Sequence, residues 1–102
     1  MDQLGAITMF VTTVDQGSFT RAAACLGKTT SALTKAVSHL ESQLGTRLLE
    51  RSTRRIALTE AGHIYLASAR QVLRQLQQAG EDIERLQQEM CGTLRLVAPP
   101  SF

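Results

Sequence analysis

The chain has 102 residues, of which 43% are hydrophobic and 20% charged, a composition that excludes a disordered segment and suits one compact domain with an appendage. The net charge of +2 is unevenly distributed: residues 1–58 hold seven basic and four acidic residues, whereas residues 59–91 hold three and five. A basic first half suggests an anionic partner, most commonly nucleic acid, although an ordinary solvated surface accounts for the charge equally well.

The two cysteines, Cys25 and Cys91, are too few for a disulfide framework. Cys25 lies in an alanine-rich segment and is expected to pack as a small apolar residue. Neither a signal peptide nor a membrane span is predicted, because Asp2 follows at once and no apolar run approaches roughly 20 residues. We therefore expect a cytoplasmic, reduced protein.

The first predicted helix has apolar residues at intervals of three and four, and it ends near Gly17. Its apolar stripe consists of Leu4, Ile7, Val11 and Val14. Ser18 is the expected N-cap of a short second helix over 19–26. Gly27 ends this second helix, since glycine readily adopts the positive φ that such a turn needs.

A third helix is predicted from its N-cap Thr29 to about Leu44, where Gly45 ends it. A short helix, a glycine turn and a longer helix form the layout of a helix-turn-helix, whose second helix enters the major groove. The N-terminal end of that helix carries hydroxyls and a lysine, which can bind bases and phosphates: Thr30, Ser31, Thr34 and Lys35. The alternative is the solvent-facing side of a small helical bundle.

Residues 47–58 predict a β-hairpin, since two apolar segments flank a polar turn. A hairpin after a helix-turn-helix is a wing. Its tip carries Arg51, Arg54 and Arg55, which could contact phosphates or a narrow minor groove. An exposed loop with incidental charge is the alternative.

Thr59 is the expected N-cap of a long helix over 60–91, about 48 Å in length. Apolar and small residues step along it by four and three, a heptad pattern typical of paired helices. Tyr65, Ala69, Val72, Leu76, Ala79, Ile83, Leu86 and Met90 form this pattern. The residues from Ala69 to Leu86 are expected to pair with a second subunit, whereas the first turns, around Ile64 and Tyr65, are expected to fold back on their own domain.

The last segment, 92–102, differs from the rest of the chain. Residues 93–97 predict a β-strand that Pro99 and Pro100 interrupt. A single terminal strand lacks a partner, so we interpret this segment as the truncated start of another domain and the chain as a fragment of a longer protein.

These motifs resemble those of the N-terminal DNA-binding domain of LysR-type transcriptional regulators. The resemblance covers residues 1–97 and rests on several motifs in order: F-V-x-x-V at 10–14, G-S-F-T at 17–20, S-A-L-T-K at 31–35, R-L-L-x-R at 47–51, R-x-x-L-T-E-A-G at 55–62 and G-x-L-R-L at 92–96. It implies a mainly α fold: a winged helix-turn-helix over 1–59, with the helix-turn-helix itself at about 19–38, followed by the dimerising linker helix.

The resemblance also implies partners and contacts. Two subunits would bind an inverted-repeat operator in double-stranded DNA, the full-length protein would often form tetramers, and a missing sensor domain would bind a small-molecule effector. The implied DNA contacts are Thr29, Thr30, Ser31, Thr34, Lys35, Arg51, Arg54 and Arg55. Lys28 and Thr30 depart from the family pattern, so no base preference follows from relatives.

The sequence allows two other function classes to be compared with a DNA-binding domain. The first is a protein–protein interaction module whose long helix mediates association without DNA readout. The second is an enzyme, which the sequence does not support: the only histidines are His39 and His63, and no zinc spacing, phosphate-binding loop or nucleophile elbow is present. We predict no catalytic residue, metal or cofactor.

Overall fold

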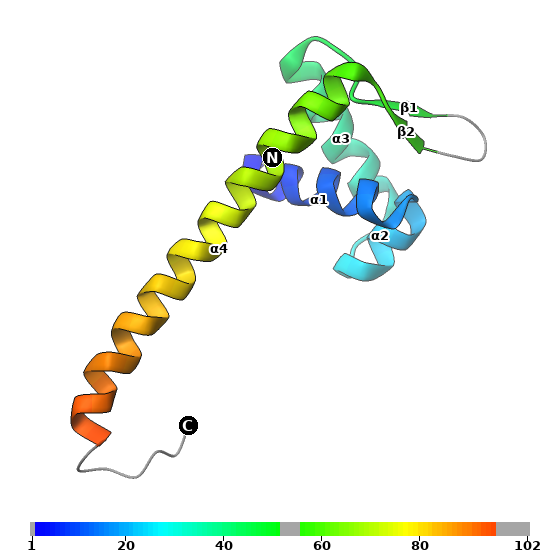
Figure 1. Cartoon of the computed structure of the whole chain (residues 1–102). Coiled ribbons are helices and arrows are strands. Elements are labelled where there is room, and N and C mark those ends of the chain that lie inside the picture. The colour runs from blue at the N-terminus through cyan, green and yellow to red at the C-terminus, as the bar shows by residue number, and fades with distance from the viewer. Residues whose placement is uncertain (1, 52–55, 96–102) are drawn as a thin grey trace. The chain divides into compact units, whose positions relative to one another are not determined.

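The computed structural model describes residues 2–51 and 56–95, with side chains to residue 90. Within these ranges the chain forms four helices and a two-stranded sheet (Figure 1). In chain order they are α1 (Gln3–Gln16), α2 (Phe19–Leu26), α3 (Thr30–Leu44), β1 (Leu49–Arg51), β2 (Ile56–Leu58) and α4 (Glu60–Arg95). This mainly α architecture with a hairpin wing confirms the predicted fold class.

Local capping rules account for the bounds of α2 and the start of α3. Ser18 accepts a hydrogen bond from the backbone N–H of Arg21 at 3.2 Å, and Thr29 accepts one from Ala32 at 3.1 Å. Side-chain acceptors of this kind satisfy N–H groups that the first helical turn leaves unpaired. Gly27 ends α2 at φ 66°, as predicted, and thereby turns the chain into α3.

The core lies between α1, α2 and α3, with α1 packed against both of the others. Phe10 is its largest fully buried side chain, and its ring centroid lies 5.8 Å from that of Tyr65 in α4. The buried side chains are those of Ala6, Ile7, Phe10, Val11, Thr13, Ala22, Ala23, Leu33, Ala36, Val37, Leu40, Leu48, Leu49 and Ala69. Thr13 is the polar member, and its hydroxyl donates to the Met9 carbonyl at 2.7 Å.

The wing is an antiparallel pair in which Leu49 faces Leu58 and Arg51 faces Ile56. Its base is buried, because Leu48 and Leu49 enter the core beside the helices. The backbone N–H of Thr59 donates to the Leu48 carbonyl at 3.0 Å, which closes the hairpin where α4 begins. The residues between the strands, 52–55, lie outside the described part of the chain.

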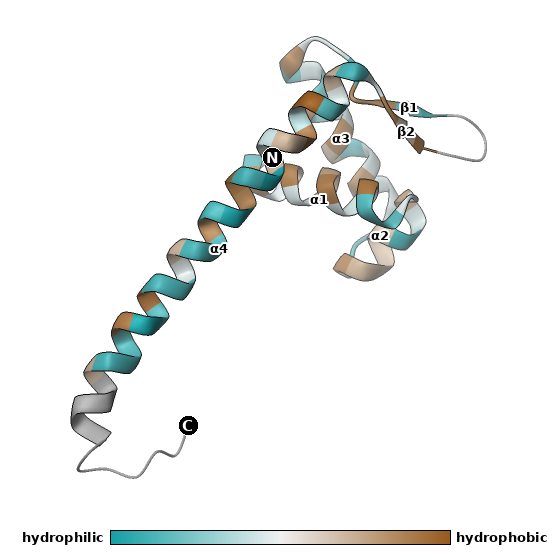
Figure 2. Ribbon diagram, in the orientation of Figure 1, coloured by the Kyte–Doolittle hydropathy of each residue, from teal (hydrophilic) through white to brown (hydrophobic). Residues whose placement is uncertain are grey.

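The backbone of helix α4 is continuous, but the chain divides within it into two compact structural units, residues 1–71 and residues 72–102. In the first unit, Asp15 of α1 and Arg70 of α4 form an ion pair at 2.6 Å. In the second unit, Figure 2 shows apolar residues alternating with polar ones along the helix. The exposed apolar residues there are Val72, Leu76, Ile83, Leu86 and Met90.

Three sequence predictions are wrong. Cys25 is exposed, because α2 turns Ala22 and Ala23 inward and Cys25 outward. Ile64 is 68% exposed, although its neighbour Tyr65 packs as expected. Residues 93–95 are helical rather than extended: no strand of the described residues pairs with them, and a helix satisfies their backbone hydrogen bonds locally.

Candidate nucleic-acid interface

The polar face predicted for the third helix lies at the start of α3. Thr30, Ser31 and Lys35 are exposed, and Thr34 is half-buried beside them. Residues three and four apart share one side of a helix, so these side chains form a single surface. It presents hydroxyls and an ammonium group at the end of the helix that a helix-turn-helix inserts into a groove.

Two hydroxyls of this face already take part in hydrogen bonds within the helix. Thr29 accepts from the Ala32 N–H, and the Thr34 hydroxyl donates to the Thr30 carbonyl at 3.1 Å. The exposed side chains of Thr30, Ser31 and Lys35 are therefore the stronger candidates for contacts with bases and phosphates.

Lys28, one of the departures from the family pattern, lies in the turn before α3. Its backbone N–H donates to the Ala23 carbonyl at 2.9 Å, so its main chain completes the end of α2. Its side chain is exposed. This position is compatible with both a phosphate contact and a solvated turn residue.

The wing arginines differ in what the structure describes. Arg51 is held by two partners: its Nη2 lies 3.4 Å from Oε1 of Glu41, and its guanidinium lies 5.2 Å above the Phe19 ring. Its side chain is 29% exposed, so Arg51 ties the far end of β1 to α3 and α2 rather than extending freely into solvent. Arg54 and Arg55 lie outside the described residues.

Glu41 is the residue of this region that sequence reasoning missed. Its Oε2 accepts hydrogen bonds from the backbone N–H groups of Leu48 at 2.8 Å and Leu49 at 3.2 Å. One signal was present in the sequence: Glu41 is the single acid of α3 and lies near the C-terminal end, where the helix dipole disfavours a carboxylate.

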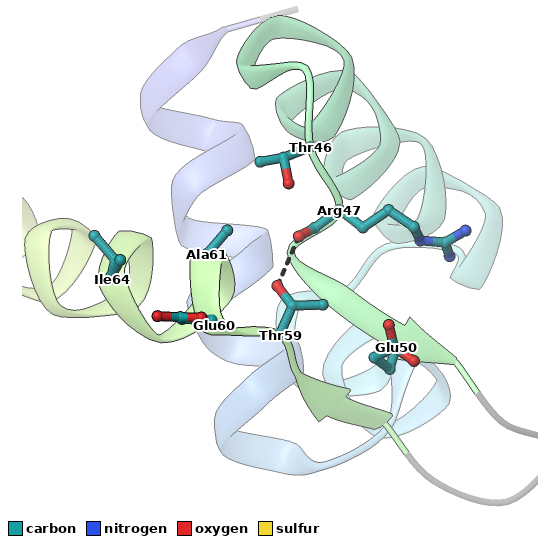
Figure 3. A pocket seen from close by; sticks show the side chains of 7 residues that line it. All are labelled: Thr46, Arg47, Glu50, Thr59, Glu60, Ala61 and Ile64. Atoms are coloured by element: carbon teal, nitrogen blue, oxygen red, sulfur yellow. Dashed lines mark hydrogen bonds between the residues drawn. The ribbon is translucent and has the colours of Figure 1, made fainter.

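A shallow depression lies where the wing meets α4 (Figure 3). It is lined by Thr46, Arg47, Glu50, Thr59, Glu60, Ala61 and Ile64. The Thr59 hydroxyl, drawn there, donates to the Arg47 carbonyl at 2.6 Å and accepts from the Gly62 N–H at 2.9 Å. These bonds confirm the predicted cap of α4 and give the depression a structural role.

Among the described residues, no group of His, Cys, Asp and Glu side chains could hold a metal ion. Within the same ranges, no helix combines the length and apolar character that crossing a bilayer requires.

The predicted dimer interface falls on α4 in two parts. Ala69 is only 2% exposed, because it is buried within the unit of residues 1–71, and this leaves little surface for a second chain. Val72, Leu76, Ile83 and Leu86 are 41–56% exposed, and Ala79 is exposed as well. The predicted interface is thus restricted to the five residues from Val72 to Leu86, here called the α4 seam.

A helix-turn-helix with an antiparallel wing and a polar recognition face defines a winged-helix protein of the nucleic-acid-binding type. Residues 4–63 match the family model of bacterial regulatory helix-turn-helix proteins of the lysR family. The chain therefore belongs to the LysR family.

Individual proteins agree with this assignment. An HTH-type transcriptional regulator of Xanthomonas campestris pv. campestris (strain 8004) is 43% identical over 94 residues, which cover 92% of this chain and 27% of that protein. The HTH-type transcriptional activator AaeR of Escherichia coli (strain K12) is 41% identical over 96 residues, covering 94% of this chain and 31% of that protein. The chain thus spans about a third or less of these relatives.

A solved structure, the complex of the BenM DNA-binding domain with catB site 1 DNA, superposes with a TM-score of 0.78 at 32% identity. The superposition covers 84% of this chain and 96% of that one. The two relatives are transcriptional regulators, and two structural neighbours are DNA-binding domains in complex with DNA, which favours a DNA-binding regulator over an interaction module without DNA readout.

Proposed function

We propose that this chain is the DNA-binding and dimerisation part of a ligand-responsive bacterial transcriptional regulator, acting in the cytoplasm. The observation that carries the proposal is the exposed polar face at the start of α3, set within a helix-turn-helix. Thr30 and Ser31 would contact base edges, and Lys35 would neutralise a phosphate. Thr29 and Thr34 would add DNA contacts from the same helical turns. Arg51, Arg54 and Arg55 would contact DNA from the wing.

The α4 seam supports a homodimer. Its large side chains Val72, Leu76, Ile83 and Leu86 leave about half of their surface in water in the single chain, and pairing with the same residues of a second copy would bury them. A dimer presents two α3 helices, which matches an inverted-repeat site with half-sites about one helical turn, roughly 34 Å, apart.

The remainder of a full-length protein would supply the regulation. Because the chain spans about a third or less of its relatives, we propose that the segment 92–102 begins a sensor domain, which binds a small-molecule effector and promotes assembly to tetramers.

Selection of binding sites from a random duplex pool tests the proposal. The intact chain should enrich an inverted repeat, and Ser31→Ala and Lys35→Ala should weaken or alter that enrichment. Matched controls are Ser42→Ala, an exposed serine near the end of α3, and Arg74→Ala, an exposed cation of the second unit. If the intact chain enriches no sequence, or if test and control variants behave alike, the polar face of α3 does not read DNA.

A further inference from the structure

We propose that Glu41 is a positioning residue for DNA recognition: it fixes the wing against the recognition helix without itself contacting DNA. This inference rests on the proposed function, because it assigns to Glu41 the task of aligning two DNA-contacting elements.

The first part of the evidence is the contact with the wing backbone. A single carboxylate oxygen, Oε2 of Glu41, accepts from the N–H groups of Leu48 and Leu49, at 2.8 and 3.2 Å. Leu49 is the first residue of β1, so α3 holds the wing strand at the point where it starts. Hydrogen bonds to an ionised acceptor are stronger than neutral ones, and the Glu41 side chain is only 13% exposed.

The second part is the contact with Arg51. The other carboxylate oxygen, Oε1, pairs with Arg51 at 3.4 Å, and the Arg51 guanidinium stacks 5.2 Å above the ring of Phe19. Phe19 is the first residue of α2. Through one side chain, therefore, the recognition helix is joined to both ends of β1 and, by way of Arg51, to the start of α2.

The negative charge of Glu41 allows a positioning role to be distinguished from simple repulsion of DNA, because the two predict opposite changes in affinity. A carboxylate close to DNA repels phosphates, so its neutralisation alone should strengthen binding to any duplex. If Glu41 instead aligns α3 with the wing, its neutralisation should weaken binding to the preferred site, where both elements must fit at once. The two effects are opposite and can be separated.

The test compares Glu41→Gln with Glu84→Gln, which removes the same charge from an exposed residue of the second unit. The glutamine has nearly the same size but is uncharged and keeps a single acceptor oxygen, because its N–H₂ group only donates and cannot accept from Arg51 or from the wing N–H groups. We expect affinity for the selected duplex to fall about tenfold while affinity for a scrambled duplex stays equal or rises. Glu84→Gln should leave the ratio of the two affinities unchanged.

A measurement without DNA keeps the inference separate from the proposed function. Amide exchange followed by NMR should show faster exchange at Leu48 and Leu49 in Glu41→Gln, while amides of α1 remain protected. If the intact chain binds no duplex selectively, the proposed function fails. If the intact chain is selective and Glu41→Gln is equally selective, only the positioning role of Glu41 is overturned.

A second variant covers the possibility that Glu41→Gln does not fold. Arg51→Gln leaves the bonds from Glu41 to Leu48 and Leu49 in place and removes both the ion pair with Glu41 and the stacking on Phe19. It should reduce selectivity, and combining it with Glu41→Gln should add little, because both changes break one network. Selectivity retained in Arg51→Gln, or fully additive losses in the double variant, would contradict an action of Glu41 through Arg51.

Discussion

The carbonyl of Leu48 lies against the Cα of Gly62, in the space that a side chain at position 62 would need. A Cβ built on Gly62 overlaps the Leu48 carbonyl oxygen and also lies 2.9 Å from Cδ2 of Leu58. The first turn of α4 therefore packs directly on the backbone at the base of the wing. Only glycine allows this approach, since the obstacle is main chain and cannot rotate away.

Gly62→Ala should consequently destabilise the domain by about 3 kcal/mol, at the upper end of the usual cost of overpacking. Urea unfolding followed by circular dichroism measures the effect. Gly80→Ala is the matched control, because a Cβ at Gly80 meets nothing within 4 Å. In a helix interior this control should stabilise by about 0.5–1 kcal/mol. Equal effects of the two changes would refute the close packing at Gly62.

These two glycines show where sequence reasoning stops. Both lie within the same predicted helix, and nothing in the local sequence separates them, because the difference arises from a segment 14 residues earlier in the chain. The caps at Ser18, Thr29 and Thr59 were predictable, since each depends only on residues three positions away.

The Thr59 hydroxyl makes one local hydrogen bond, from the Gly62 N–H, and one distant hydrogen bond, to the Arg47 carbonyl. A single substitution tests both. Thr59→Ala removes both the cap of α4 and the hydrogen bond to the Arg47 carbonyl, so we expect a loss of about 1–2 kcal/mol. Thr59→Ser retains the hydroxyl and should lose much less. Thermal unfolding of both variants distinguishes them, and a serine variant as unstable as the alanine variant would argue against the hydroxyl.

In the candidate site, too, features set by local spacing were predictable from the sequence, whereas contacts with distant segments were not. The polar face of α3 was found because helical spacing fixes which residues share a side. Glu41 was missed because its partners are seven, eight and ten residues away and belong to the wing. Ile64 and Cys25 were placed in the core incorrectly, since their apolar character does not reveal which side of a helix meets the rest of the domain.

The ion pair between Asp15 and Arg70 should contribute little to stability. The carboxylate of Asp15 accepts two hydrogen bonds from the Arg70 guanidinium, and this contact raises the pKa of Arg70. The side chains of Asp15 and Arg70 are nevertheless 47% and 41% exposed. Exposed pairs contribute about 0.2–1 kcal/mol. A double-mutant cycle with Asp15→Asn and Arg70→Gln should give a coupling in this range, reduced by added salt. A coupling well above it would indicate a larger role in attaching α4.

The α4 seam predicts an effect on association rather than on folding. Leu76→Glu places a charge among apolar side chains that we propose are buried between subunits, so sedimentation analysis should shift from dimer toward monomer. Gln75→Glu adds the same charge at the neighbouring exposed position and should leave the dimer intact. Circular dichroism should show similar helix content for both. If Leu76→Glu remains as dimeric as the control, the seam is not the interface.

Lys35 and Ser31 should differ in how they change DNA binding, because we propose that Lys35 neutralises a phosphate and that Ser31 contacts a base edge. The logarithm of affinity falls with the logarithm of salt concentration by about 0.9 per neutralised phosphate. In a dimer, Lys35→Ala removes two such contacts, so the slope should become shallower by about 1.8. Ser31→Ala removes no charge and should leave the slope unchanged while altering base preference at one position of each half-site. Titrations of the selected duplex at several salt concentrations measure both quantities. An unchanged slope in Lys35→Ala would place this lysine away from the phosphates, although it is exposed beside Ser31 on the same face of α3.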